Sequence, residues 1–413
     1  MIARFSLYGF LKNQRYFEPF IVLFFLDQGL SFAQIGLLIG FRELCHTIGE
    51  IPSGAVADLY GRRRCMMFSF VAYIASFMVF GFLQSYAFFF LAMFLFAVGE
   101  AFRTGTHKSM IFTWLRIQGR TDEKNKVYGY TRSWSQLGSA FSIIVATVIV
   151  VFTYNYGSLF LIAIIPYSIG LLNFMSYPRE LDGKPSDEVS LRNVIIHLRD
   201  ALRDSLTLGP LRRLMIESMA FEGVFKAAKD YIQPILKNMA LAIPVFVAME
   251  ETRRTAIVVG VVYLVLHLGS AYASRHSHEV AGRAGGEERG SSVLWKVSFL
   301  LYLLLIPLLL FELYYGAIAL FVALYLIQNL WRPLLISRFD AFSTEQQQAT
   351  VLSIESQAKA TSTMIVAPLL GLAVDRLESL GGGGGFWPVG AIGAVAALFV
   401  LLSARRQGDS NVP

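Results

Sequence analysis

The stretch Glu50-Ile-Pro-Ser-Gly-Ala-Val-Ala-Asp-Leu-Tyr-Gly-Arg-Arg-Arg64 decides how this chain is organised, because it closes one long apolar segment and precedes another. Gly54 allows close contact between helices, Asp58 places a carboxylate at the boundary of the apolar segment, and Gly61 allows a turn. The three arginines that follow are typical of the cytoplasmic side of a membrane. The stretch therefore predicts a cytoplasmic turn between two membrane spans.

The composition of the chain indicates a membrane protein. Of its 413 residues, 55% are hydrophobic and 16% are charged, and the mean hydropathy is +0.54, so a water-soluble domain of this length would lack polar residues to cover its surface. Basic cytoplasmic loops explain the net charge of +7, and we expect no nucleic-acid partner. The two cysteines, Cys45 and Cys65, lie in or beside apolar segments, which argues against a disulfide framework. Polar residues 12–15 interrupt the first apolar run, so no cleaved signal peptide is expected.

Apolar segments of about 20 residues, the length that crosses a bilayer, recur along the chain. They predict twelve spans, at residues 5–27, 32–57, 65–83, 86–113, 127–152, 157–177, 211–236, 255–274, 292–312, 316–337, 348–373 and 386–404. The first, seventh and eleventh carry several ionisable residues, which a helix facing lipid would not tolerate. We expect the ionisable faces of these three helices to point into the bundle.

The distribution of basic residues predicts the orientation in the membrane. Alternate connections contain clusters of basic residues, at Arg62 to Arg64, at Arg116, Arg120, Lys124 and Lys126, and in the long connection that follows Arg179. This asymmetry predicts an integral protein of the cell membrane, inner or plasma, with both termini cytoplasmic. The second half is less regular, because Arg253, Arg254 and Arg376 would lie outside.

The longest polar connection separates the spans into two groups of six. The predicted parts are an N-terminal six-helix bundle at 1–177, a cytoplasmic linker at 178–210, a C-terminal six-helix bundle at 211–404 and a cytoplasmic tail at 405–413. Apolar residues recur at helical spacing between 191 and 202, which predicts an amphipathic helix in the linker. This helix would lie on the membrane surface or pack on the bundle.

An internal repeat supports two related halves. Tyr16-Phe-Glu18-Pro19 in the first span reappears as Tyr231-Ile-Gln233-Pro234 in the seventh, and Gly54 matches Gly269 at the same offset. A further match pairs Glu100-Ala-Phe-Arg103 with Asn329-Leu-Trp-Arg332. The sequence therefore predicts an all-α polytopic membrane protein with twelve transmembrane helices in two pseudo-symmetric six-helix bundles. Such repeats place a substrate path between them, near the bilayer midplane.

The pattern Gly54-x-x-x-Asp58-x-x-Gly61-Arg62-Arg63 resembles the signature loop between helices two and three of the major facilitator superfamily. Two departures are Leu59, where the family usually has arginine, and the second-half copy Ala273-Ser-Arg275, which lacks the acid. The resemblance implies an inter-domain latch, formed by Gly54, Asp58, Gly61, Arg62 and Arg63, that holds one access state. The capping box Ser343-Thr-Glu-Gln346 would offer Asp58 a helix N-terminus. The alternative is that Arg62 to Arg64 only anchor the topology.

Ionisable residues inside the spans are the site candidates, because each costs about 2.5 to 3.5 kcal/mol in hydrocarbon unless it has a partner or a water-filled cavity. Glu100 and Arg103 are three residues apart and can pair, so protonation of Glu100 would free Arg103 for a substrate or for another acid. Adjacent Arg42 and Glu43 are expected to point in different directions. The candidates for proton coupling are Glu43, Glu100, Arg103, Glu222 and Glu355.

The polar stripes of the spans supply candidates for a substrate cavity. They are Lys12, Arg15, Tyr16, Glu18, Arg132, Gln136, Lys226, Tyr231, Asn329, Arg332, Gln357 and Lys359. The alternative for each is structural pairing, such as Arg15 with Glu18 or Glu222 with Lys226. These charges are balanced in sign and favour neither an anionic nor a cationic substrate, while the nearby aromatic residues suit an amphiphilic solute.

Motifs of other function classes are missing from the sequence. It contains no metalloprotease, nucleophile-elbow or phosphate-loop motif, and His276-Ser-His278-Glu279 lies in a predicted polar loop without a further spaced ligand. We therefore expect no enzyme, no cofactor and no metal site.

The remaining features favour a secondary transporter of a small organic solute, working by alternating access, coupled to protons or another ion, monomeric in the bilayer. Export of an amphiphilic compound is favoured, although the fifth span lacks the glycine-proline pattern of drug antiporters in this superfamily. The alternatives are uptake of a sugar, organic acid or other metabolite, and a scaffold or lipid-handling protein that does not transport.

Overall fold

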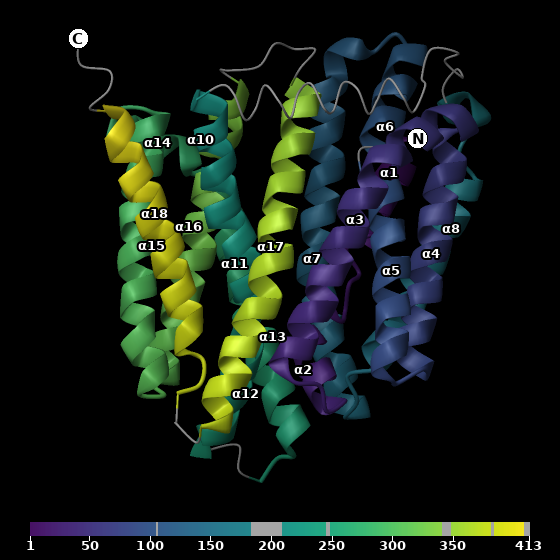
Figure 1. Ribbon diagram of the computed structural model, residues 1–413. Coiled ribbons are helices and arrows are strands. Elements are labelled where there is room, and N and C mark those ends of the chain that lie inside the picture. The colour runs from purple at the N-terminus through teal and green to yellow at the C-terminus, as the bar shows by residue number, and fades with distance from the viewer. Residues whose placement is uncertain (105, 183–208, 245–247, 341–347, 381–383, 409–413) are drawn as a thin grey trace. The chain divides into compact units, whose positions relative to one another are not determined.

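The computed structural model describes residues 1–104, 106–182, 209–244, 248–340, 348–380 and 384–408 (Figure 1). Every regular element in these ranges is helical, as expected where lipid offers the backbone no hydrogen-bond partner. The helices of the first half are α1 (Ile2–Leu11), α2 (Ile21–Asp27), α3 (Phe32–Tyr60), α4 (Arg62–Phe82), α5 (Tyr86–Arg103), α6 (Thr106–Ile117), α7 (Lys124–Thr153) and α8 (Ser158–Met175). Short 3₁₀ turns are η1 (Glu18–Phe20), η2 (Thr121–Glu123) and η3 (Arg179–Asp182).

The second half follows the same pattern of long helices. Its helices are α10 (Gly209–Ser218), α11 (Val224–Ala228), α12 (Ile232–Ala242), α13 (Glu251–Arg275), α14 (Ser277–Ala284), α15 (Glu287–Leu310), α16 (Tyr314–Asp340), α17 (Gln348–Ser379) and α18 (Trp387–Gly408). A π-helical turn, η4 (Met219–Gly223), and a 3₁₀ turn, η5 (Lys229–Tyr231), lie between α10 and α12. Within the described residues, eight helices are long and apolar enough to cross a membrane, and Ile2–Leu11 and Trp387–Ser403 are shorter apolar helices.

The two spans that share the tyrosine-proline motif are both interrupted. The first consists of α1, η1 and α2, and the seventh consists of α10, η4, α11, η5 and α12. Pro19 lies in η1 and Pro234 lies in the first turn of α12, where a proline needs no hydrogen-bond partner for its nitrogen. Interrupted helices in membrane proteins are tolerated where they face protein or a cavity, so both breaks mark the polar interior of their half.

Packing divides the chain into two compact units, Met1–Phe24 with Phe41–His197 and Phe25–Gly40 with Leu198–Pro413. The bundle boundaries at 177 and 211 stay a prediction. Residues 183–208, which include the expected amphipathic helix, lie outside the described residues. In the first unit α4 packs on α5 and α8. The hydroxyls of Ser69 and Ser76 in α4 donate to the carbonyls of Gly99 and Ala92 in α5, at 2.6 and 2.7 Å.

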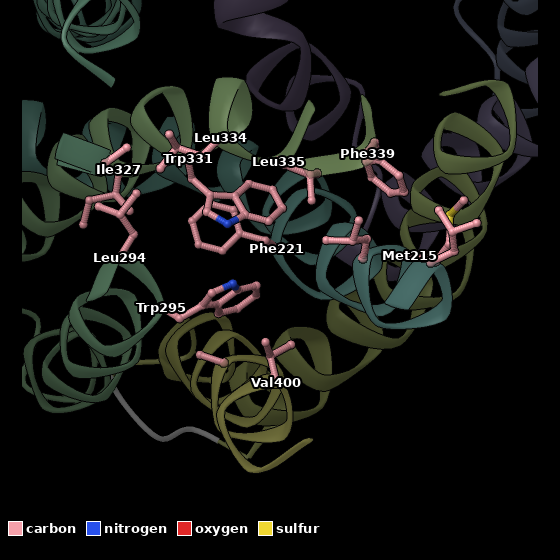
Figure 2. Close-up of a cluster of buried hydrophobic side chains, with 14 of the residues drawn as sticks. Met215, Phe221, Leu294, Trp295, Ile327, Trp331, Leu334, Leu335, Phe339 and Val400 are labelled. Atoms are coloured by element: carbon pink, nitrogen blue, oxygen red, sulfur yellow. The ribbon is translucent and has the colours of Figure 1, made fainter. Parts of the chain in front are cut away.

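The core of the second unit contains a cluster of large aromatic residues. Phe221 of η4 lies between Trp295 of α15 and Trp331 of α16, with ring centroids 4.7 and 4.5 Å away (Figure 2). In the same unit α15 and α18 lie side by side (Figure 1). Trp331 is fully buried, so it belongs to the packing core that supports η4.

The N-terminal part of α3 packs tightly on α17 in the second unit. A Cβ added at Gly36 would lie 2.3 Å from the carbonyl oxygen of Ala367, and one at Gly371 would lie 2.1 Å from that of Phe32. The Asp375 carboxylate accepts hydrogen bonds from the backbone N–H groups of Phe32 and Ala33, both at 2.8 Å. This carboxylate caps the positive end of α3 and joins it to α17.

One predicted loop is wrong. Residues 276–290 were expected to form a polar loop, but Ser277–Ala284 form α14, which packs on α15 and α16. Its apolar positions, such as Ala281, are buried against Gly290. The sequence analysis missed this amphipathic helix because its other face is polar. A short helix that packs on only one side needs few apolar residues.

Candidate functional site

A partly buried acid and two arginines form the polar centre of the first unit. Glu100 of α5 pairs with Arg15, which lies in the break between α1 and η1, at 2.7 Å, and with Arg103 one turn along its own helix. The Tyr73 hydroxyl of α4 donates to Glu100 Oε2 at 3.0 Å, and Arg103 Nε donates to the Tyr73 oxygen at 3.1 Å. The three charged side chains are only 16 to 24% exposed. This cluster has one negative and two positive charges.

The second unit holds a corresponding network with two acids and two bases. Arg332 of α16 forms two hydrogen bonds with the carboxylate of Glu355 in α17, at 2.7 and 3.1 Å, and its Nη1 lies 2.9 Å from Glu222 of η4. Lys359 Nζ lies 3.2 Å from Glu222 and 3.8 Å from Glu355. The hydroxyl of Ser218 donates to Glu355, whose side chain is 1% exposed. The π-helical turn that presents Glu222 is a feature often found at functional sites.

A further buried ion pair lies beside this network. Arg338 binds Glu217 with two hydrogen bonds, at 2.6 and 3.1 Å, and Arg213 reaches the same acid at 3.1 Å. The sequence analysis did not single out Arg338, which lies near the C-terminal end of α16. The four-residue spacing of Arg213 and Glu217 is a signal in the sequence that could have pointed to this place.

Three predicted cavity residues line one pocket of the first unit. Lys12, Arg132 and Gln136 surround a pocket of about 350 Å³ between α1, α6 and α7. Its wall also contains the aromatic rings of Tyr8 and Tyr128. The structure therefore separates Lys12 and Arg132, which face this pocket, from Arg15, which binds Glu100.

Other predicted cavity residues have structural contacts. The Asn329 amide donates to Ser270 at 3.0 Å, which ties α16 to α13. Tyr231 stacks on Phe32 with centroids 5.6 Å apart, and Tyr16 is buried. Glu18 is exposed on η1, and Lys226 lies in α11. Gln357 of α17 has a buried amide nitrogen that makes no hydrogen bond within the described residues.

Glu43 has a partner that the sequence analysis excluded. Arg42 and Glu43 were expected to point apart, but Arg42 Nη2 lies 2.8 Å from Glu43 Oε1 and its Nε lies 3.2 Å from the same atom. The long arginine side chain bends around the helix to reach its neighbour. Glu43 is thus a buried carboxylate with an arginine partner.

The signature loop is tied to its own unit. Gly61 has φ +97° and directly precedes α4 as its N-cap, and a Cβ there would lie 2.9 Å from the Asp182 side chain. The Arg63 N–H donates to Asp182 Oδ1 at 2.8 Å, and Arg62 donates to the Thr113 hydroxyl at 2.9 Å. At Gly54 a Cβ would meet no described atom within 4 Å. The side chain of Asp58 and the capping box at 343–346 lie outside the described residues.

Two contacts of the polar centre in the first unit escaped the sequence analysis. Tyr73 is fully buried and bridges Glu100 and Arg103, yet it lies in a strongly apolar span where nothing marks it as polar. The bond between Arg15 and Glu100 joins residues that are 85 positions apart. Helical spacing predicts contacts within one helix only, so neither was accessible from the sequence.

Comparison with known proteins agrees with this architecture. Residues 5–357 match the Major Facilitator Superfamily. A segment of 104 residues is 33% identical to the uncharacterized MFS-type transporter YxaM of Bacillus subtilis (strain 168), and this match spans 25% of each protein.

Solved transporters share the whole fold. The nucleoside transporter NupG has a TM-score of 0.76 at 12% identity over 97% of both chains. The D-xylose-proton symporter has a TM-score of 0.65 at 14% identity, covering 97% of this chain and 95% of its own. At such identities the likeness shows the fold and leaves the substrate open. The predicted all-helical fold of twelve transmembrane helices in two six-helix bundles is confirmed, and the chain belongs to the major facilitator superfamily of membrane transporters.

Proposed function

We propose that the protein is a proton-coupled secondary transporter, which moves a small organic solute by alternating access and exports amphiphilic compounds. The observation that carries the proposal is a carboxylate held by a repeat-related arginine in each half. Arg103 binds Glu100 in the first unit, and its repeat partner Arg332 binds Glu355 in the second. Intramembrane acids that are held in this way are the usual sites of proton relay in transporters.

Protonation of Glu100 would change the charge of the first network in one step. The ionised carboxylate accepts hydrogen bonds from Arg15, Arg103 and Tyr73. A proton on this carboxyl group removes its negative charge and weakens its attraction for both guanidinium groups. These groups then become available to a solute or to another acid, so proton binding and solute binding are linked.

The network of the second unit corresponds to that of the first unit, but its charges sum to zero. Glu222 and Glu355 balance Arg332 and Lys359, so this network needs no further ion in its present state. Loss or gain of a proton there would leave one charge unbalanced in a low-dielectric interior, which favours a change of conformation. We propose Glu222 and Glu355 as coupling residues of this half, and Glu43 as a third candidate.

We further propose that the signature loop acts as a latch for one access state. The bonds of Arg62 to Thr113 and of Arg63 to Asp182 support this role, because they hold the turn rigidly on its own unit. A rigid turn could present Asp58 in a constant position. The orientation with both termini cytoplasmic belongs to the same proposal.

Purified protein in liposomes tests the coupling. An imposed pH gradient should produce proton flux that depends on the solute, recorded with a pH-sensitive dye inside the vesicles. Glu100→Gln should abolish accumulation driven by the gradient and preserve exchange of solute. The matched control is Glu123→Gln, because Glu123 also pairs with an arginine three residues away, Arg120 at 2.7 Å, but at the surface.

The outcomes separate the parts of the proposal. Unchanged gradient-driven transport in Glu100→Gln would remove Glu100 from the mechanism. Lack of solute-dependent proton flux across a broad solute panel would refute proton coupling. Export predicts that cells producing the wild-type protein retain less of a transported amphiphile than cells producing Glu100→Gln, and greater retention would indicate uptake.

A further inference from the structure

The pocket between α1, α6 and α7 is a built cavity, and its shape is set by backbone contacts. A Cβ at Gly9 would lie 2.8 Å from the carbonyl oxygen of Thr131, and one at Gly138 would lie 2.5 Å from that of Phe10, so α1 and α7 touch at two places. The Asn13 amide also donates to the Ser135 carbonyl at 2.5 Å. These contacts fix the position of α1, which Lys12 follows directly, and of α7, which carries Arg132. The volume of about 350 Å³ lies within the range of small-molecule sites.

The charge of this pocket is positive. Lys12 and Arg132 line it, and no carboxylate is among its described lining residues. Within the described structure neither cation forms an ion pair of 4 Å or less, and Lys12 Nζ lies 5.8 Å from the centroid of the Tyr8 ring. The nearby acid, Glu100, is already shared by two arginines. Two basic side chains that face one pocket without a carboxylate in its described lining favour a negatively charged ligand over a positively charged one.

The other walls suit a planar ring. Tyr8, Tyr128 and Phe5 contribute aromatic surface, and the Tyr8 ring lies against that of His107, tilted by 30° with centroids 3.8 Å apart. The Gln136 amide lines the same pocket and can bind a polar substituent. Aromatic walls with a few convergent polar groups are typical of sites for small organic molecules.

We propose that this pocket is the solute site of the first unit and that the solute is a small aromatic organic anion, with a carboxylate or phosphate head group bound by Lys12 and Arg132. This inference rests on the proposed transport function and names the substrate class for it. It also refines the sequence analysis, in which the intramembrane charges were balanced overall. The structure places Lys12 and Arg132 together in one pocket of the first unit, whereas two acids and two cations balance one another in the described network of the second unit.

The test is ligand binding to purified full-length protein in detergent, without any gradient. Benzoate, phenyl phosphate, benzyl alcohol and benzylamine are titrated separately, and the rise in unfolding temperature gives each dissociation constant, since a bound ligand stabilises by mass action. Benzoate or phenyl phosphate should stabilise the wild type, and the tighter of the two identifies the head group. Benzyl alcohol and benzylamine, which lack the negative charge, should bind at least about tenfold more weakly.

Three variants and one control localise the binding. Lys12→Gln and Arg132→Gln should each weaken anion binding about tenfold, which corresponds to about 1.4 kcal/mol. Lys12→Arg keeps the charge and should bind within about threefold of the wild type. The control is Arg116→Gln, which removes a cation from the exposed last turn of α6 and should leave the dissociation constant unchanged.

Several results would overturn the inference. These are stabilisation by benzylamine equal to that by the anions, absence of stabilisation by either anion, and unchanged anion binding in both glutamine variants. The proposed function fails differently. Anion binding without proton flux would support the proposed solute site and refute proton coupling. Proton flux with a neutral or cationic solute, without anion binding, would support proton coupling and refute the proposed solute site.

Discussion

Replacing Arg332 by methionine should destabilise the second unit by breaking its charge balance. Arg332 makes two hydrogen bonds with Glu355, at 2.7 and 3.1 Å, and a contact of 2.9 Å with Glu222. Without it, two buried carboxylates share the single charge of Lys359. Removing one partner of a buried ion pair costs about 3 to 5 kcal/mol. Because the Arg332 side chain is 31% exposed, we expect a reduced loss of about 2 to 3 kcal/mol in the free energy of unfolding.

A double-mutant cycle separates this effect from a simple loss of packing. Arg332→Met combined with Glu355→Gln removes one charge of each sign and leaves Glu222 paired with Lys359 at 3.2 Å. The double variant should therefore be more stable than Arg332→Met alone, with a coupling energy of about 1 to 3 kcal/mol. Denaturant unfolding in mixed micelles, followed by tryptophan fluorescence, measures all four corners. Trp331, next to Arg332 in the chain, lies in the buried aromatic cluster and reports on this unit.

A surface ion pair provides the control. Arg283 pairs with Glu279 at 3.2 Å but is 84% exposed, so Arg283→Met should change the free energy of unfolding by less than about 0.5 kcal/mol. If Arg332→Met costs no more than this control, or if the double variant is as unstable as the single one, the charges of the network are not coupled and the reasoning fails.

Three further substitutions test the close contacts of the fold. Asp375→Ala removes both hydrogen bonds that cap α3. It should lower the free energy of unfolding, measured with denaturant, by about 1 to 2 kcal/mol. An unchanged free energy of unfolding would show that water caps this helix equally well. Gly371→Ala should lower the free energy of unfolding by about 1 to 3 kcal/mol, because its Cβ would lie 2.1 Å from a backbone oxygen. At Gly54 the described structure has open space, so Gly54→Ala should be as stable as the wild type. Equal effects at these two glycines would contradict the described packing of α3. Asp182→Ala should loosen the turn at the start of α4 and increase its proteolytic cleavage, and unchanged cleavage would mean that the arginine contact does not hold the turn.

The sequence was sufficient to identify many residues of the candidate site and the helices on which they lie. It was not sufficient to predict which residue pairs with which across different helices. The rarity of charges inside apolar spans pointed to Glu100, Arg103, Arg332 and Glu355, and all four lie in buried networks. The spacing rule also anticipated the Glu100 and Arg103 pair, because both residues lie on one helix. It could not reach the bond from Arg15 to Glu100, and it favoured the wrong geometry for Arg42 and Glu43.

The sequence by itself determined the membrane location, the number of spans and the relation of the two halves, because hydropathy, basic clusters and repeated motifs are properties of neighbouring residues. Only the tertiary structure decided how the charges combine. It placed Glu100 between two arginines, left Lys12 and Arg132 around a pocket without an acid in its described lining, and balanced the network of Arg332. The physical reason is that an ionisable side chain in a low-dielectric interior is stabilised by an opposite charge close to it. The packing of other helices sets the distance between the two charges, and the local sequence does not encode that distance.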